Sequence, residues 1–214
     1  MIHGVKSVIF DMDGVLIESE PLYFEATEKI FKRSFNVSIA PYFIEAIGRR
    51  SEEALSHYIS KLGLEVKPQH LVERQLEEYC ALLKEKTPLV PGSVELINAL
   101  KSRYRLALAS SAKPEPVRIV LSKLGGHGLF EVVVTGDDVS YGKPDPEIYL
   151  TAAHRLGLSP TRCLVIEDSE NGVKAAKNAG MRCIAVPTKF TRGQDLTRAD
   201  LIVNNLRDIS AYLL

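Results

Sequence analysis

The stretch VIFDMDG, residues 8–14, decides the fold. Within it, a short apolar run stops abruptly at two acids, Asp11 and Asp13, and a glycine. Short apolar runs bounded by polar residues are typical of buried strands, and strands that are apolar on both faces belong to parallel sheets covered by helices. The same pattern returns at residues 106–109 and 163–166, where each run again ends in polar residues. The chain is therefore expected to contain a buried parallel sheet.

Further runs of strand length alternate with segments in which apolar residues recur every three or four positions, the spacing of an amphipathic helix. The further runs are residues 132–134, 183–186 and 201–203, and the helical segments include residues 94–100 and 117–124. This alternation predicts an α/β fold with a doubly wound parallel sheet, a Rossmann-like core. Asp145 before Pro146 indicates the start of one helix, and Gly180 indicates the end of another.

The strand pattern disappears between the first run and residue 87. In its place, helical spacing continues through the whole segment, and the pairs Thr87-Pro88 and Pro91-Gly92 mark the return to the sheet. The sequence thus predicts a discontinuous core domain, residues 1–16 and 89–214, interrupted by an inserted all-α domain, residues 17–88.

The composition is that of an ordinary globular protein. Of the 214 residues, 45% are hydrophobic and 25% are charged, and 27 basic residues balance 27 acidic ones. This excludes a disordered or coiled-coil chain, and no global charge attracts nucleic acid or a membrane. The three cysteines have no metal-ligand spacing, and no apolar run approaches the roughly 18 residues of a membrane span. We expect a monomeric cytoplasmic protein with reduced, buried cysteines and neither nucleic acid nor membrane as partner.

The polar residues that follow the strands are the candidate site, because the carboxyl ends of parallel strands share one edge of the sheet. The residues expected to converge there are Asp11, Asp13, Ser110, Lys143, Glu167 and Asp168. Carboxylates gathered in one place repel one another unless a cation lies among them. A donor set of oxygen atoms without histidine or cysteine suits magnesium.

Lys143 lies in a loop, which we expect to be exposed apart from the site itself. Together with the cation it would neutralise a bound phosphate. The same positive charges are expected to lower the pKa of Asp11 and to keep it ionised, as a carboxylate nucleophile requires.

Each of these features has a structural explanation when taken alone. An Asp-x-Asp-Gly sequence is often a turn that ends a strand, Ser110 could cap the next helix, and Lys143 could be a solvated surface charge. Only their combination, in this order and after predicted strands, points to chemistry.

The same motifs identify a family resemblance. They are FDMDGVL at 10–16, PG at 91–92, ASS at 109–111, GKPDP at 142–146, IEDS at 166–169, NG at 171–172 and AGM at 179–181. In this order the chain resembles the haloacid dehalogenase superfamily of phosphatases and phosphomutases, in the subgroup related to β-phosphoglucomutase. The helical insertion resembles that subgroup's cap domain.

The resemblance implies a role for each motif residue. Asp11 is similar to the nucleophile that forms an aspartyl-phosphate, and Asp13 resembles the general acid and base. Ser110 and Lys143 match the groups that hold the phosphoryl oxygens. The implied cofactor is Mg²⁺, with Mn²⁺ or Co²⁺ as alternatives. Its implied ligands are Asp11, Asp13 through its main-chain carbonyl, Glu167 and Asp168.

The insertion departs from the mutase pattern. β-Phosphoglucomutases carry a histidine in the first cap helix, near the position of Tyr23, and a cap arginine for which Arg49 and Arg50 stand at shifted offsets. Tyr23, Arg49 and Arg50 are candidate substrate contacts, and each could instead be structural: a buried cap aromatic or a solvated helix start.

These observations predict a Mg²⁺-dependent phosphatase that acts on a small phosphorylated metabolite, a phosphorylated sugar, through an aspartyl-phosphate. The alternative within the family is a β-phosphoglucomutase-type isomerase. Outside it, a phospho-accepting signalling module also combines clustered aspartates, a hydroxyl and a lysine on a doubly wound sheet. The cap and Asp13 argue against that module, because a long-lived phospho-switch needs neither a lid nor a base that activates water.

Overall fold

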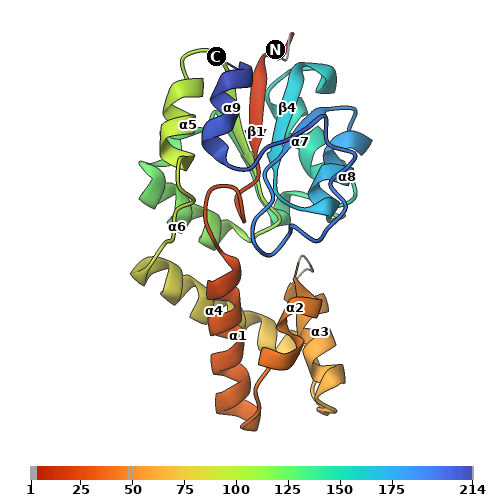
Figure 1. The fold of residues 1–214 in the computed structure, drawn as a ribbon. Coiled ribbons are helices and arrows are strands. Elements are labelled where there is room, and N and C mark those ends of the chain that lie inside the picture. Colours follow the sequence, from red (N-terminus) through yellow and green to blue (C-terminus); the bar gives the residue numbers. More distant parts are fainter. Residues whose placement is uncertain (1–3, 48, 50, 214) are drawn as a thin grey trace. The chain divides into compact units, whose positions relative to one another are not determined.

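A parallel sheet forms the centre of the larger of two units (Figure 1). The structure is a computed structural model and describes residues 4–47, 49 and 51–213. Within these residues the sheet has six strands, in the order β3-β2-β1-β4-β5-β6. They are β1 (Ser7–Phe10), β2 (Arg105–Ala109), β3 (Val132–Val134), β4 (Cys163–Glu167), β5 (Arg182–Ala185) and β6 (Leu201–Ile202). All neighbouring pairs are parallel. The predicted doubly wound sheet is confirmed, and each strand was predicted to within one residue at either end.

The winding of the sheet reverses at β1. From β1 the chain adds β2 and β3 on one side, and then returns to the other side of β1 for β4, β5 and β6. The loops after β1 and β4 therefore lead away from each other, which leaves a crevice at the carboxyl ends of these two strands. Phe10 pairs with Ile166, so the residues that follow them, Asp11 and Glu167, stand at the same level of the sheet.

Helices cover both faces of the sheet, as right-handed crossovers between parallel strands require. On one face lie α5 (Ser93–Leu100), α6 (Pro114–Leu124) and α9 (Leu206–Leu213), and on the other lie α7 (Glu147–Arg155) and α8 (Glu170–Asn178) (Figure 1). Single 3₁₀ turns, His127–Leu129, Gly136–Asp138 and Pro160–Arg162, complete the connections. The core beneath α7 and α8 brings together alternate strand residues such as Ile9, Ala107 and Val165 with Tyr149 and Ala176, all fully buried.

The second unit, Ser19–Thr87, consists of helices. They are α1 (Glu20–Phe35), a 3₁₀ turn (Ala40–Tyr42), α2 (Phe43–Ala46), α3 (Ser51–Lys61) and α4 (Gln69–Glu85). The long helices α1 and α4 pack along each other, and the core of the unit is apolar and aromatic. Its buried members include Ile30, Phe31, Leu55, Tyr58 and Leu71.

The two segments that connect the units are paired with each other. Ile17 and Leu89 form an antiparallel bridge, and the Glu18 amide donates to the carbonyl of Pro88 at 2.8 Å. Ile17 is fully buried. These contacts assign Ile17 and Pro88 to the larger unit, Met1–Glu18 and Pro88–Leu214, although both fall in the segment 17–88 that the sequence predicts as the insertion.

The local signals in the sequence correspond to observed helix ends. Gly180 has φ +74°, the left-handed conformation expected after α8. The carboxylate of Asp145 accepts a hydrogen bond from the Glu147 amide at 2.9 Å, so it satisfies a free amide at the start of α7, one residue later than predicted. All three cysteines are buried and free, as expected. No helix in the described part of the chain is both long and apolar enough to cross a membrane.

Candidate active site

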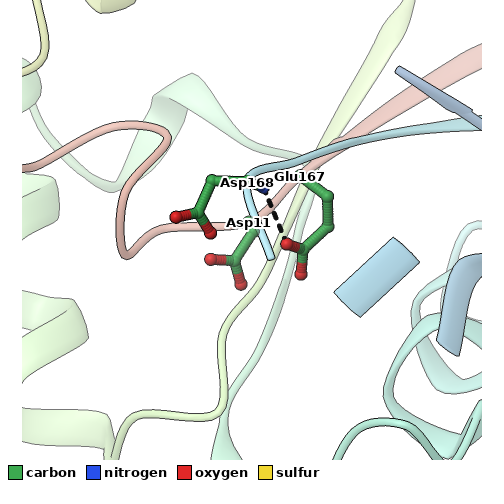
Figure 2. Close-up of side chains that lie close together, drawn as sticks. All are labelled: Asp11, Glu167 and Asp168. Carbon is green, nitrogen blue, oxygen red and sulfur yellow. Dashed lines mark hydrogen bonds between the residues drawn. The ribbon is translucent and has the colours of Figure 1, made fainter. Parts of the chain in front are cut away.

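Three carboxylates meet where β1 and β4 end (Figure 2). Asp11 follows β1 directly, and its amide donates to the carbonyl of Ile166 at 3.0 Å, which extends the pairing of the strands by one step. Glu167 is the last residue of β4, and Asp168 follows it. One side-chain oxygen of each acid lies within 4.8 Å of those of the other two, and all three residues are buried. The predicted convergence of these acids is what the structure shows.

Two glycines make room for these carboxylates. Gly14 has φ +77°, and a Cβ atom placed on it would overlap the carboxylate of Asp168. A Cβ on Gly172, in the first turn of α8, would overlap the carboxylate of Glu167. The glycines of the DMDG and NG motifs therefore allow the backbone to approach the acids closely, which no other residue type would permit.

Lys143 is the positive charge of the site. Its ammonium lies 2.6 Å from Asp11 Oδ1 and 2.6 Å from Glu167 Oε1, and only 10% of its side chain is exposed. The loop is exposed away from the site, at Tyr141 and Pro144, while the side chain of Lys143 reaches down between two buried carboxylates. Buried ammonium and carboxylate groups of this kind depend on each other, since either alone would be an uncompensated charge.

The site has more carboxylates than positively charged side chains. Burial raises the pKa of Asp11 to about 7, because lost hydration outweighs the lowering effect of Lys143, and the charges of Glu167 and Asp13 raise it further. That Lys143 and a bound cation together lower the pKa of Asp11 stays a prediction; with Lys143 alone, the effect of burial is the larger one. Burial also opposes ionisation of Glu167, but Lys143 and the donors around it hold the pKa of Glu167 below its usual range.

This donor set fits a magnesium ion. Asp11, Glu167 and Asp168 offer oxygen ligands only, and their combined negative charge is larger than the single positive charge of Lys143. A divalent cation among these oxygens would supply the positive charge that keeps Asp11 ionised.

The raised pKa of Asp11 predicts how stability depends on pH in the metal-free protein. In the unfolded chain the carboxyl titrates near its ordinary value of 3.8, and in the folded chain near 7. The folded state therefore binds more protons between these values, so stability falls as the pH rises through them. We expect Asp11→Asn to stabilise the protein in a chelator at pH ~8, by on the order of 2–4 kcal/mol, and to make little difference near pH ~4.

Urea unfolding curves at these two pH values measure the difference. The control is Asp137→Asn, which changes an exposed carboxylate to an amide. A stability difference for Asp11→Asn that does not grow with pH would contradict the raised pKa.

Ser110 and Asp13 lie beside each other. Ser110 is fully buried, and its hydroxyl accepts a hydrogen bond from the Ala112 amide at 3.1 Å. The same hydroxyl lies 3.4 Å from Asp13 Oδ2. Asp13 is half-buried. The loops after β1 and β2 thus bring these two predicted site residues together.

Two residues at the site had not been expected from the sequence. The Tyr149 hydroxyl donates to Glu167 Oε1 at 2.8 Å, and the Thr191 hydroxyl donates to Asp168 Oδ2 at 3.3 Å. Tyr149 lies within the apolar stripe of α7, and such a position by itself indicates only core packing.

The candidate contacts in the helical unit have local partners. The ring of Tyr23 stacks on that of Tyr79, with centroids 3.8 Å apart and planes 15° from parallel. Arg49 is exposed, and its Nε donates to the carbonyl of Glu45 at 3.1 Å. Arg50 lies outside the residues that the structure describes. A role for these three residues in substrate binding stays a prediction.

Comparison with known proteins places the site in a family. A sequence model of the haloacid dehalogenase-like hydrolases matches residues 5–180, which include every core motif of the site. The chain is a haloacid dehalogenase-like hydrolase. The hydrolase is 36% identical over 200 residues to the phosphorylated carbohydrates phosphatase of Thermotoga maritima, covering 92% of this chain and 93% of that protein.

A relative named as a mutase is similar to this chain to about the same degree. The hydrolase is 34% identical over 225 residues to the β-phosphoglucomutase of Bacillus subtilis, covering 98% of this chain and 94% of that protein. Among solved structures, a variant of CbbY from Rhodobacter sphaeroides in complex with xylulose-(1,5)bisphosphate has a TM-score of 0.88 at 28% identity, covering 98% of this chain and 99% of that one. The resemblance to the subgroup related to β-phosphoglucomutase is confirmed.

Proposed function

We propose that this hydrolase is a Mg²⁺-dependent phosphatase that removes the phosphoryl group from small phosphorylated sugars through an aspartyl-phosphate. One observation carries the proposal: a buried carboxylate, Asp11, is held by Lys143 at the edge of the sheet, with the Ser110–Asp13 pair in the adjoining loops. A phosphoryl group bound there would meet a nucleophile, a cation and a proton donor together. The names of the phosphatase relatives support sugar phosphates as substrates.

The reaction divides into two displacements at phosphorus. An Asp11 oxygen attacks the phosphorus atom and the bond to the sugar oxygen breaks, while Asp13 gives its proton to that departing oxygen. Asp13, now a carboxylate, takes a proton from a water molecule, whose oxygen displaces Asp11 and releases inorganic phosphate. Lys143 and Ser110 donate hydrogen bonds to the phosphoryl oxygens in both steps.

The carboxylates of Asp11 and Asp168 and the main-chain carbonyl of Asp13 would hold the magnesium ion. When bound, the ion neutralises phosphoryl charge and favours the ionised form of Asp11. Glu167, a ligand that the family resemblance implies, contributes its negative charge to the same group of carboxylates. Mn²⁺ and Co²⁺ are alternatives with similar preferences for oxygen ligands.

Phosphatase activity is favoured over isomerisation by the residue at position 23. A mutase must protect its aspartyl-phosphate from water while the sugar turns round, and it uses a cap histidine to arrange the proton transfers. Tyr23 lies near that position, and a phenol with a pKa near 10 exchanges protons poorly at neutral pH. Its ring is stacked on Tyr79. Water is therefore the expected acceptor of the phosphoryl group.

The three buried, free cysteines suit a reducing compartment, so we propose a cytoplasmic location for the enzyme. The expectation that it acts as a monomer stays a prediction.

The test is an assay of the purified protein with Mg²⁺ on a panel of phosphorylated sugars, following inorganic phosphate and isomeric sugar phosphate in the same samples. We expect released phosphate to exceed any isomer. A chelator should stop turnover and leave the circular dichroism spectrum unchanged, since the ion is catalytic and not structural. Rapid interconversion of β-glucose 1-phosphate and glucose 6-phosphate with little free phosphate would show that the protein is an isomerase and not a phosphatase.

A further inference from the structure

Glu167 is the most completely bonded carboxylate of the site. Its side chain is fully buried. Oε1 accepts hydrogen bonds from Lys143 Nζ at 2.6 Å and from the Tyr149 hydroxyl at 2.8 Å. Oε2 accepts from the amide of Asp168 at 2.8 Å and from the amide and hydroxyl of Ser169, both at 3.0 Å. A carboxylate offers about four lone-pair sites, so five donors occupy it fully.

This saturation distinguishes Glu167 from Asp11 and Asp168. Its oxygens are already committed to donors of the chain, and the ammonium of Lys143 is the one full positive charge among those donors. The Gly172 backbone lies directly against the carboxylate, because a Cβ placed on it would overlap both carboxylate oxygens. Glu167 is therefore built as a fixed anchor for Lys143.

Tyr149 completes this anchor from α7. It is fully buried, its hydroxyl shares Oε1 of Glu167 with Lys143, and the Lys143 ammonium lies 5.0 Å from the centroid of its ring. One residue thus touches both members of the Lys143–Glu167 pair: it hydrogen-bonds the carboxylate and presents its π face to the ammonium.

We infer that Tyr149 is a positioning residue: acting with Glu167, it fixes the Lys143 ammonium against Asp11, where a phosphoryl group would bind. The inference rests on the proposed function, in which Lys143 binds a phosphoryl oxygen. An ammonium has three hydrogens, and Lys143 gives one to Asp11 and one to Glu167. Because its four-carbon stem is flexible, the third hydrogen has a defined direction only while both partners are held in place.

The test compares Tyr149→Phe with Tyr104→Phe. Tyr104 is the matched control, because its hydroxyl also donates a hydrogen bond at 2.8 Å, but to the Leu213 carbonyl at the end of α9. The first readout is the affinity for inorganic phosphate in the presence of Mg²⁺, by titration calorimetry. We expect Tyr149→Phe to weaken phosphate binding by about 10- to 150-fold, as for a lost hydrogen bond to a charged group, and Tyr104→Phe to leave it within about twofold.

A double-mutant cycle separates positioning from general support of the fold. If Tyr149 acts through Lys143, adding Tyr149→Phe to Lys143→Met should change phosphate affinity by less than about twofold, because the group that it positions is gone. Additive losses would assign Tyr149 to core packing alone and overturn the inference. An unchanged affinity in the single Tyr149→Phe variant would do the same.

The Lys143 ammonium itself gives a readout that does not depend on phosphatase activity. A buried ammonium with two carboxylate partners exchanges its protons slowly and should give a resolved ¹H–¹⁵N signal that Lys143→Met removes. We expect this signal to shift or broaden in Tyr149→Phe and to persist unchanged in Tyr104→Phe. If the protein hydrolysed no phosphate ester while this signal responded as expected, the proposed function would fail and the positioning of Lys143 would stand. A signal that Tyr149→Phe leaves unchanged would refute the positioning role.

Discussion

Replacing Asp11 by asparagine is expected to lower the rate of phosphate release by about 10⁴-fold or more, the loss that follows removal of an essential nucleophile. An amide oxygen does not attack phosphorus at a useful rate, and it is also a weaker ligand for a cation. The variant should keep its fold, because the amide has almost the same shape and the carboxylate that it replaces is destabilised by burial.

The intermediate itself can be measured. Wild-type protein mixed rapidly with an ester labelled with ³²P and quenched in acid should retain label that hydroxylamine releases, as expected for an acyl phosphate. Asp11→Asn should retain none, and Asp137→Asn, on an exposed turn, should behave as wild type. Label on the Asp11→Asn protein, or more than trace turnover by it, would mean that another group is the nucleophile.

Replacing Asp13 by asparagine should have the second largest effect, for a different reason. The nucleophile is retained, but neither the departing sugar oxygen nor the attacking water has its proton transferred, and each assistance is worth roughly 10²- to 10⁴-fold. The Ser110 hydroxyl, 3.4 Å from Asp13, does not replace it, since a serine hydroxyl is not acidic enough.

The leaving group distinguishes the two steps. For a sugar phosphate, both proton transfers are lost in Asp13→Asn, so the labelled intermediate should form slowly. For p-nitrophenyl phosphate, whose leaving oxygen needs no proton, the intermediate should form at nearly the wild-type rate and then accumulate, because water attack is still unassisted. Equal steady-state rates for wild type and variant on the sugar phosphate would remove Asp13 from the mechanism.

The sheet and the placement of the acids could be predicted because both are local properties of the sequence. An apolar run that stops at Asp11 or at Glu167 marks the end of a buried strand, and parallel strands necessarily present those ends together. No measurement of distance is needed for that inference. The alternation of strands and helices then determines that the residues after β1 and β4 face the same crevice.

What could not be predicted depends on how side chains pack. Lys143 was expected at the site, but the depth to which its side chain reaches between Asp11 and Glu167 depends on packing, which no spacing in the sequence encodes. The raised pKa of Asp11 has the same origin, because it reflects how completely water is removed and not which residues are near. Tyr149 was missed since its apolar neighbours in α7 explain its position without any reference to the site.

The paired segments at Ile17 and Leu89 have a consequence for how such enzymes can diversify. Because the chain leaves the sheet unit and re-enters it at adjacent points, joined by the Glu18–Pro88 hydrogen bond, the length of what lies between them imposes no strain on β1 or β2. The entropy of closing a loop grows only with the logarithm of its length, so a whole domain costs only about 2 kcal/mol more there than a short loop. The insertion can thus be exchanged at a single junction, while the carboxylates at the ends of β1 and β4 keep their register.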